Sequence, residues 1–391
     1  MRRGCEVAII GGGIMGCATA FELARRGLDV VVLEKGVVGG GATGRSSAIV
    51  RQHYSHEITA RMALYGLRVF ERFDERVGGE SGFVRRGFLL LVPEADRCGL
   101  EANVALQRRL GIRTEVLPVE VLPGLVPGLD PGGLAAAAWE EDSGYADPHM
   151  TTQAYAAAAR RHGAAVEQGV AATGVVFEGD RVCGVRTSAG FLESGAVVNC
   201  AGPWGAQVGA LAGLDLPIRA ARIQVAVFER PPAFRGPHPV VLDFVHGSYF
   251  RPETGGLSLV GRIDPAEAAA VVDPDDYGSH ADDAFVADVG DRWVRRVPPM
   301  DESRSRGGYA GLYAVTPDWH PIVDEVPPGS GHFTCAGFSG HGFKLAPAVG
   351  VMMAQLVITD PAPEFDPAPF RLARFAEGKP VRSAYQYSIT G

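Results

Sequence analysis

Several features that mark particular classes of protein are scarce or missing in this chain. Its cysteines, at positions 5, 17, 98, 183, 200 and 335, form no CxxC pair, which argues against a disulfide scaffold or structural zinc and fits a reducing compartment. The formal net charge is −8 with no basic stripe, so nucleic acids and anionic membrane surfaces are poor partners. No GxSxG motif is present, so a hydrolase has no support.

Long apolar runs are also missing. None reaches the roughly 18 residues that a membrane-spanning helix needs. Arg2 and Arg3, followed by apolar residues, could suggest a signal peptide, but Glu6 and the glycine turn after Ile10 interrupt its apolar part. We therefore expect a cytoplasmic protein with no membrane span.

Glycine, in contrast, is abundant, with 52 residues among 391. Two glycine-rich loops stand near opposite ends of the chain. Residues 11–16 read GGGIMG and follow an apolar run, whereas residues 337–344 read GFSGHGFK and precede a predicted helix over 345–357. Two such loops suggest one long cofactor held from both ends, and a flavin dinucleotide fits that better than a nicotinamide.

The first loop has the organisation of a dinucleotide-binding turn. The apolar run Val7–Ile10 predicts a buried parallel strand, and a helix is expected from about residue 14 to 26. Gly11 permits the tight turn, Gly13 lets the backbone approach a pyrophosphate, and Gly16 lets the helix pack on the strand. The free N–H groups at the helix start would then face the phosphates.

A second strand and an acidic residue complete this unit. Residues 30–33 read VVVL and predict the next strand, and Glu34 follows about 20 residues beyond the glycines. A carboxylate at this position accepts hydrogen bonds from the adenosine ribose and disfavours a 2′-phosphate. The pattern therefore predicts a dinucleotide without a 2′-phosphate on its adenosine ribose and makes NADP a poor candidate.

The remaining patterns predict an α/β protein with a discontinuous Rossmann-like domain. Alternating runs at 223–228, 248–251 and 257–261 indicate antiparallel strands, and residues 321–323 and 332–336 return to buried-strand character. Helices are expected over 56–76, 97–111, 149–162 and 282–296, and a strand over 84–92. We assign 1–80, 145–214 and 311–391 to an FAD-binding domain, with an inserted α+β substrate domain, built on a mainly antiparallel sheet, over 81–144 and 215–310.

Three motifs carry a resemblance to a known family. They are GGGATGRSSAIVRQHY at 39–54, NCAGPW at 199–204 and GFSGHGFK at 337–344. Over most of its length the chain resembles the D-amino-acid oxidase-like FAD-dependent oxidoreductases, in particular sarcosine oxidases and related N-methyl amino-acid oxidoreductases. The resemblance implies oxidation of the C–N bond of a small amino acid by hydride transfer to flavin N5, followed by hydrolysis of the imine.

The resemblance also assigns roles to individual residues. It implies that Arg51 and Lys344 bind the substrate carboxylate and that Tyr313 lines the pocket. A surface arginine in an ion pair and a buried core tyrosine stay open as alternatives. The residues expected to bind FAD are Gly11, Gly13, Ile14, Met15, Gly16, Glu34, Lys35, Thr43, Gly44, Ser46, Ser47, Val170, Ala201, Gly202, Trp204, Gly337, Gly340, His341, Gly342, Phe343 and Lys344.

Two departures from the family pattern bear on the chemistry. Gly311 stands where monomeric sarcosine oxidase attaches a cysteine to the flavin, so we expect non-covalent FAD. Ser258 and Arg262 align with a lysine that helps flavin react with oxygen and with a pocket histidine, which leaves oxidase activity in doubt. No metal is predicted, because His53 and His56 lack a third ligand.

Two alternatives to a self-sufficient oxidase of a small amino acid therefore stay open. One is a flavin dehydrogenase subunit that passes electrons to a partner protein, which would be a separate chain because no iron–sulfur motif is present. The other is a tailoring oxidase that acts on a larger amine. The expected partners are an amine or amino-acid substrate and either O2 or an electron-acceptor protein.

Overall fold

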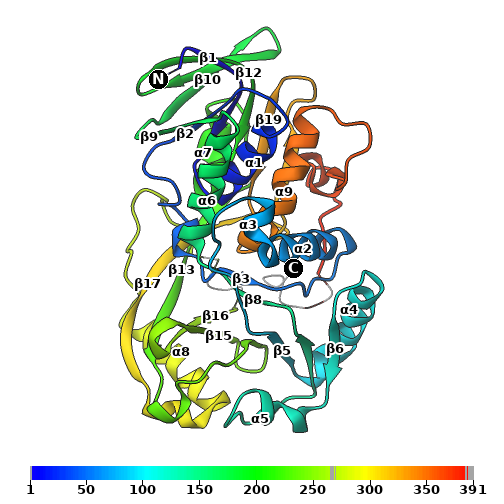
Figure 1. Ribbon diagram of the computed structural model, residues 1–391, viewed down its shortest axis with the longest axis vertical. Coiled ribbons are helices and arrows are strands. Elements are labelled where there is room, and N and C mark those ends of the chain that lie inside the picture. The colour runs from blue at the N-terminus through cyan, green and yellow to red at the C-terminus, as the bar shows by residue number, and fades with distance from the viewer. Residues whose placement is uncertain (1, 265–267, 269, 384, 386–391) are drawn as a thin grey trace.

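Two large β-sheets organise the molecule. In the computed structural model, which describes residues 2–264, 268, 270–383 and 385, the first sheet and its helices occupy the upper half of Figure 1 and the second sheet the lower half. The first sheet has the order β10-β11-β12-β1-β2-β9, with β19 beside β12 and β18 beside β19. Its strands are β1 (Gly4–Ile10), β2 (Val30–Glu34), β9 (Ala165–Gln168), β10 (Ala172–Glu178), β11 (Arg181–Thr187), β12 (Gly190–Asn199), β18 (Ile322–Glu325) and β19 (His332–Ala336).

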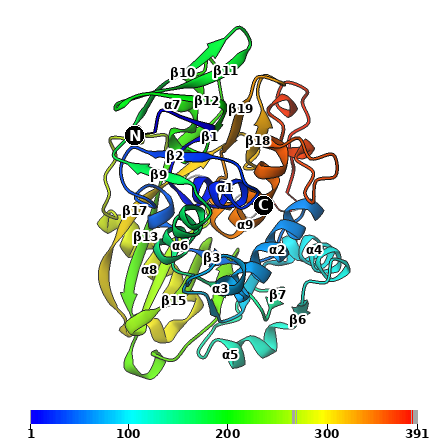
Figure 2. The same cartoon turned by 45° about the horizontal axis from the view of Figure 1, so that its top comes forward.

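Strands from three distant parts of the sequence form the parallel centre of this sheet. β1 pairs in parallel with β2 and with β12, and β12 pairs in parallel with β19. One face packs on α1 (Ile14–Ala24) and α6 (Pro148–Arg161), and α9 (Gly342–Val357) packs on α1 in the same core. Figure 2 shows α1 and α9 adjacent beside the sheet. The predicted α/β class with a discontinuous Rossmann-like unit is confirmed.

The second sheet has the order β17-β13-β16-β15-β14-β5-β7-β6. Only the β14–β5 pair is parallel, so the predicted mainly antiparallel sheet is also confirmed. One face packs on α8 (Asp283–Arg296), and the other faces the first unit. The strands are β5 (Phe88–Val92), β6 (Thr114–Leu117), β7 (Ala136–Glu140), β13 (Arg219–Glu229), β14 (Val240–Asp243), β15 (Ser248–Glu253), β16 (Leu257–Arg262) and β17 (Arg304–Val315).

The predicted domain boundaries stay a prediction, and β17 runs across the one at 310/311. A small sheet of β3 (Ile49–Val50), β8 (Gly144–Tyr145) and β4 (Val84–Arg85) joins the two units. No helix in the described part of the chain is long and apolar enough to cross a membrane.

Two expected elements are divided. The strand predicted over 84–92 is interrupted at Gly87, whose φ of +77° ends β4 before β5 begins. The helix predicted over 56–76 is α2 (Glu57–Glu71) and α3 (Phe73–Arg76), separated by the non-helical Arg72. The other long helices lie within two to three residues of expectation, and α4 covers Arg97–Arg109.

Candidate functional site

The first glycine-rich loop is a tight turn that only glycine can form. Gly11 has φ +113°, and a Cβ there would lie 2.5 Å from the carbonyl oxygen of Cys200. A Cβ at Gly16 would overlap the carbonyl oxygen of Gly11, so α1 could not pack this closely with any other residue. Gly13 is the N-cap of α1, and the helix therefore begins directly behind the turn. Such a start offers unpaired N–H groups to an anion.

Glu34 lies at the end of β2, directly beside this turn. Its carboxylate accepts hydrogen bonds of 2.7 Å from the backbone N–H groups of Gly12 and Gly36. A carboxylate offers about four lone-pair positions, so acceptor capacity is left for ribose hydroxyls. The side chain also lines the cavity that opens in front of the turn.

Two adjoining cavities form one groove from Glu34 to the second glycine-rich loop. The nucleotide end, as we call the first, is lined by Gly11, Gly13, Glu34, Lys35, Ala201 and Trp204. The pocket end is lined by Arg51, Tyr313 and the loop from Ser339 to Lys344, among others. Residues that line both ends are Ile14, Met15, Ala42, Thr43, Gly202 and Pro203. A long ligand could therefore lie across the start of α1 and reach both loops.

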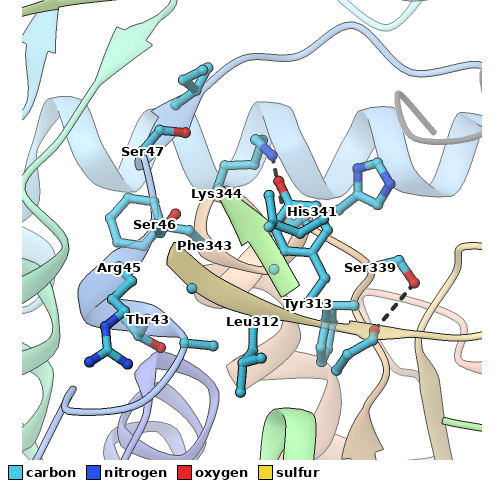
Figure 3. A pocket seen from close by; sticks show the side chains of 18 of the residues that line it. Thr43, Arg45, Ser46, Ser47, Leu312, Tyr313, Ser339, His341, Phe343 and Lys344 are labelled. Atoms are coloured by element: carbon cyan, nitrogen blue, oxygen red, sulfur yellow. Dashed lines mark hydrogen bonds between the residues drawn. The ribbon is translucent and has the colours of Figure 1, made fainter. Parts of the chain in front are cut away.

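The second loop is held against β17. Ser339, at φ +48°, donates its N–H to the carbonyl of Ala314 at 2.9 Å. Gly340 has φ +90°, and a Cβ there would lie 2.6 Å from the ring of Tyr313. The sequence therefore needs glycine at 340 for the backbone and for the tyrosine beside it. Figure 3 shows Tyr313, His341 and Lys344 gathered around this loop.

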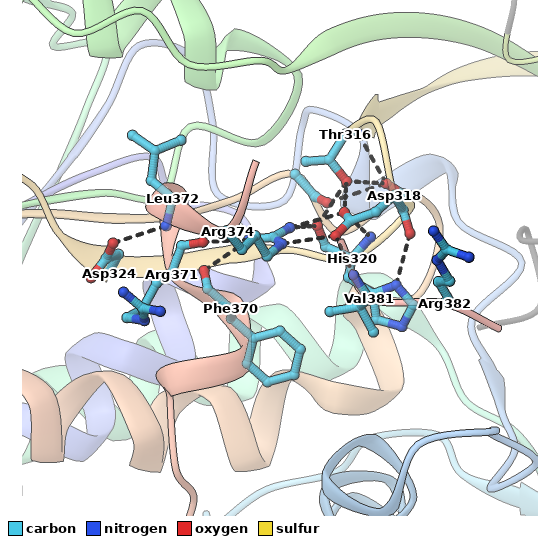
Figure 4. A network of polar contacts seen from close by, with 12 residues as sticks. Thr316, Asp318, His320, Asp324, Phe370, Arg371, Leu372, Arg374, Val381 and Arg382 are labelled. Atoms are coloured by element: carbon cyan, nitrogen blue, oxygen red, sulfur yellow. Dashed lines mark hydrogen bonds and ion pairs between the residues drawn. The ribbon is translucent and has the colours of Figure 1, made fainter. Parts of the chain in front are cut away.

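A buried polar network fixes the segment behind the loop (Figure 4). Arg374 donates to both carboxylate oxygens of Asp318, at 2.8 and 2.9 Å, and to the carbonyl of His320 at 2.8 Å. Burial raises the pKa of Asp318, but the hydrogen bonds and charge of Arg374, together with the backbone N–H groups of Val381 and His320, outweigh it and the pKa is lowered. The ring of His320 stacks on that of His341 with centroids 6.3 Å apart. The chain after α9 thus supports the pocket end.

The pocket end gathers buried cationic groups. Arg51 and Lys344 are each only 5% exposed. Arg51 donates to the carbonyl of His53 and lies 4.5 Å from the ring centre of Tyr54, while the Lys344 ammonium lies 3.5 Å from the carbonyl of His341. Burial, and then the charge of Arg51, lowers the pKa of Lys344 well below its ordinary value. Burial, then Lys344 and Arg51, likewise lowers the pKa of His341.

The charges of the pocket end indicate what kind of ligand it suits. Two buried cationic side chains near each other repel, and an anion between them relieves that repulsion. The nucleotide end offers a glycine cradle and a helix start, which suit a pyrophosphate. Judged by these residues, the groove fits a flavin dinucleotide together with a carboxylate-bearing molecule.

Most residues expected at the cofactor line this groove, and four do not. Gly16 packs under the turn, and Gly44 packs against His149 of α6. Gly337 packs against Thr316, and Val170 donates its N–H to the carbonyl of Glu34. The lining includes the other expected cofactor residues: Gly11, Gly13, Ile14, Met15, Glu34, Lys35, Thr43, Ser46, Ser47, Ala201, Gly202, Trp204, Gly340, His341, Gly342, Phe343 and Lys344.

Ser258, which aligns with an oxygen-activating lysine of the family, does not line the groove. Ser258 is fully buried and accepts a hydrogen bond from Arg230 at 2.9 Å, with His238 at 3.2 Å, away from the lining of the groove. Arg262 does line the pocket end, where Asp288 of α8 pairs with its guanidinium at 2.7 Å. The two positions lie on one strand, but only the second borders the groove.

The two histidines considered as a metal pair have other partners. The ring of His53 bonds to the hydroxyl of Tyr385 at 2.6 Å, and that of His56 to the carbonyl of Arg382 at 2.5 Å. His56 is the N-cap residue of α2 but makes no capping bond with its side chain. Within the described ranges, no group of three or more His, Cys, Asp or Glu residues is placed to hold a metal.

Sequence reasoning missed the wall that the second sheet contributes. It includes Leu242 of β14 and Tyr249 of β15, and Ile263, directly after β16, and Ile49 of β3 add to it. Tyr249 and both of its neighbours on β15 are buried, so burial does not distinguish the two faces of the strand. The face that meets the groove depends on how the sheets pack. Arg45, in the 39–54 motif, also lines the groove and was not singled out.

A family model described as "FAD dependent oxidoreductase" matches residues 6–356. Among curated proteins, mitochondrial sarcosine dehydrogenase of Homo sapiens is 28% identical over 381 residues, covering 95% of this chain but 41% of that protein. The chain thus spans about two fifths of the length of that relative. The sarcosine oxidase subunit beta of Rhodobacter capsulatus is 28% identical over 381 residues, covering 96% of this chain and 89% of that one.

Among solved structures, an L-proline dehydrogenase from P. horikoshii superimposes with a TM-score of 0.89 at 29% identity. The match covers 97% of this chain and 100% of that chain. The resemblance inferred from the three motifs is therefore confirmed over nearly the whole length.

Proposed function

The chain belongs to the family of FAD-dependent oxidoreductases, and from that premise we propose that it oxidises the C–N bond of a small amino acid or N-methylated amino acid. FAD is the cofactor of this family and of this chain. The single observation that carries the proposal is the burial of Arg51 and Lys344 in one pocket at the end of the FAD groove. The planar guanidinium of an arginine can donate two parallel hydrogen bonds to one carboxylate, and the ammonium of a lysine adds positive charge without a fixed direction.

In this proposal the pocket residues position the substrate. Arg51 and Lys344 hold its carboxylate, and Tyr313 borders the space where the amine-bearing carbon would lie. Leu242, Tyr249 and Ile263 form an apolar wall that limits water near the reacting carbon. Bound FAD supplies a two-electron acceptor for the hydride of that carbon. The resulting imine is then hydrolysed by water.

The proposed FAD contacts are those of the expected cofactor residues that line the groove. Glu34 holds the ribose, and the turn at Gly11 and Gly13 meets the pyrophosphate. The start of α9 and the side chain of Lys344 favour negative charge at the flavin edge. The residues from Phe338 to Lys344, which line the pocket end, would thus serve the cofactor and the substrate together.

We propose that the FAD is non-covalent. Gly311, at the position of the flavin-attaching cysteine in monomeric sarcosine oxidase, lines the pocket end and has no thiol to attach. Among the described residues, no cysteine lines that end. Acid precipitation should therefore leave the flavin in the supernatant. A yellow pellet under a colourless supernatant contradicts non-covalent binding.

Anaerobic mixing tests the reaction itself. The flavin absorbance should bleach with one or more of sarcosine, proline, glycine and D-amino acids. Because hydride loss needs a free amine lone pair, the rate of bleaching should rise with pH through the pKa of the bound amine. Bleaching only by large amines without a carboxylate would favour a tailoring oxidase and contradict the proposal.

A second candidate differs in the electron acceptor. Among the described residues, Lys344 is the only lysine at the pocket end, and the strands of the second sheet contain no lysine. This supports a dehydrogenase that passes electrons to a separate partner protein and not to O2. Reoxidation of the reduced flavin distinguishes the two: fast recovery in air favours an oxidase, whereas slow recovery with fast dye reduction favours the dehydrogenase.

A cytoplasmic location is part of the proposal. All six cysteines are free, and three of them are buried, which suits a reducing compartment. Fractionation of the producing cells, with the flavoprotein followed by immunoblotting, tests the location.

A further inference from the structure

A segment of the second unit reaches across to the nucleotide end of the groove. We call residues 273–278 the clasp segment. Its base is fixed to β13 by Arg222, which donates to the carbonyls of Gly278 at 2.9 Å and His280 at 2.6 Å and pairs with Asp282 at 2.8 Å. At its other end, the N–H of Val272 bonds to the carbonyl of Ala220 at 3.0 Å. The segment thus projects from a firmly attached base.

The tip of the clasp segment contacts side chains that line the groove. Asp275 forms an ion pair with Lys35 and accepts a hydrogen bond from the indole N–H of Trp204 at 2.9 Å. The Lys35 ammonium lies 4.1 Å from the ring centre of Trp204, so the three groups form one cluster. Tyr277 bonds through its hydroxyl to Arg45, whose guanidinium lies 5.7 Å from the tyrosine ring centre.

All three partners of the tip belong to the wall of the groove. Lys35 and Trp204 line the nucleotide end, and Arg45 lines the pocket end. Asp275 and Tyr277 themselves do not line it, so they act through these side chains. A dinucleotide in the groove would therefore border Lys35 and Trp204, the two side chains that Asp275 holds together.

The contacts of the clasp tip are weak enough to break and re-form. Lys35 and Asp275 keep 45% and 56% of their side-chain surface exposed, and such exposed pairs are weak and screened by salt. The Arg374–Asp318 pair behind the second loop, in contrast, is 2% exposed on both sides. The Arg374–Asp318 pair is thus part of the buried interior, whereas the Lys35–Asp275 pair lies at the surface, where it can break without exposing buried groups.

We propose that the clasp segment retains the dinucleotide, with Asp275 and Tyr277 as positioning residues for Lys35, Trp204 and Arg45. Opening of the clasp admits and releases FAD, and its contacts slow the release. A non-covalent cofactor needs such retention more than a covalent one. The proposal concerns cofactor retention and does not depend on which amine is oxidised.

Release of FAD from the purified holoenzyme tests this proposal. Free FAD is separated by ultrafiltration at intervals after dilution and quantified by fluorescence. Asp275→Asn should release FAD about threefold to tenfold faster at low salt, because the ion pair with Lys35 is lost. In wild type the release should accelerate towards the rate of the variant as salt is raised to about 0.5 M, whereas the variant should change little.

The clasp offers a matched control and a second variant. Asp276 is an exposed neighbour of the same charge, and its side chain makes no hydrogen bond or ion pair with the described residues, so Asp276→Asn should release FAD at the wild-type rate. Tyr277→Phe keeps the ring and loses the hydroxyl bond to Arg45, so it should accelerate release less than Asp275→Asn. Equal rates for wild type, Asp275→Asn and Tyr277→Phe overturn the proposal, as does equal acceleration by Asp276→Asn. Circular dichroism of each holoprotein confirms that folding is retained.

Discussion

The two ends of the groove are built in different ways. The nucleotide end comes mainly from one continuous stretch, β1, the turn, α1 and β2, and it offers backbone N–H groups and one carboxylate. The pocket end combines β3, the second sheet and the start of α9, and it offers side-chain charge. A backbone cradle is specified by where glycine stands, whereas a charged pocket is specified by how distant elements pack. The two ends should therefore fail differently when mutated.

The largest effect is expected from Gly16→Ala. The added methyl group would overlap the carbonyl oxygen of Gly11, so the turn or α1 must shift. We expect a colourless protein on purification and a loss of FAD affinity of at least about 100-fold, measured by titration with FAD. Gly195→Ala, on β12 of the same sheet, is the control, because nothing lies within 4 Å of the added Cβ. Normal FAD content in Gly16→Ala would show that the cradle does not need the close approach.

Glu34→Ala should weaken the nucleotide end without abolishing it. The change removes the proposed ribose acceptor and leaves the N–H groups of Gly12 and Gly36 without their partner. We expect FAD binding to weaken by about 1–3 kcal/mol in the same titration. Glu34→Gln keeps one acceptor oxygen, so its FAD affinity should lie between those of Glu34→Ala and wild type. An unchanged FAD affinity in Glu34→Ala would exclude a ribose contact.

Lys344→Met should spare FAD retention and impair the pocket end. It removes a buried cation that we assign both to the carboxylate and to the flavin edge, so flavin reduction should slow about tenfold at saturating substrate, and substrate binding should weaken. Stopped-flow absorbance under anaerobic conditions measures both. Lys379→Met, at an exposed lysine, is the matched control. If Lys344→Met loses its FAD, but its flavin is reduced at the normal rate once FAD is added back, Lys344 serves the cofactor alone and does not bind the substrate.

The smallest effect concerns a buried acid beside the Arg51 segment. Glu140 is fully buried at the end of β7 and accepts bonds from the N–H of Gln52 at 2.8 Å and the hydroxyl of Ser143 at 2.6 Å. Burial raises its pKa to about 7, although these bonds and the charge of Arg51 oppose the shift. The folded protein thus binds a proton between about pH 4.5 and 7 that the unfolded chain has lost. The free energy of unfolding that this group contributes is therefore largest below about pH 4.5 and decreases as the pH rises to about 7.

Glu140→Gln imitates the protonated acid and should reverse this loss. The full shift corresponds to about 3 kcal/mol as an upper limit, and we expect a gain of about 1 kcal/mol at pH 8, because the amide replaces one acceptor by a donor. At pH 4.5 the variant should match wild type. Urea unfolding of the holoprotein at both pH values measures the difference. Equal stability at pH 8 would place the pKa of Glu140 near its ordinary value.

The sequence predicts the nucleotide end well, because its signals are local. Gly11, Gly16 and Glu34 lie within one strand–helix–strand unit. The two glycines have the turn and packing positions that their spacing indicates, and Glu34 ends β2 beside them, while its contact with the ribose stays a prediction. Even the second loop could be located, since glycines followed by a helix are a local pattern. The buried-strand character of 332–336 indicated only that this segment belongs to the same discontinuous domain. Its pairing with β12, more than 130 residues away along the chain, was not predicted.

The pocket wall and the clasp could not be predicted in the same way. Ser258 and Arg262 lie on one strand, but only the packing of the second sheet decides which faces the groove. Asp275 lies in a stretch rich in aspartate that is most simply interpreted as a solvated turn, and its contact with Lys35 spans 240 positions. Side chains that meet only through tertiary packing leave no mark in a single sequence.

The most direct test of the account compares two ligands and two proteins. The rate of anaerobic flavin reduction is measured for a substrate amino acid and for its amide, with wild type and with Arg51→Lys, which keeps the charge but loses the planar fork. We predict that the amide is a poor substrate for wild type, and that Arg51→Lys raises the KM of the amino acid about tenfold while hardly changing that of the amide. Equal losses with both ligands would contradict the account, because Arg51 would then support the fold or the FAD and not the carboxylate.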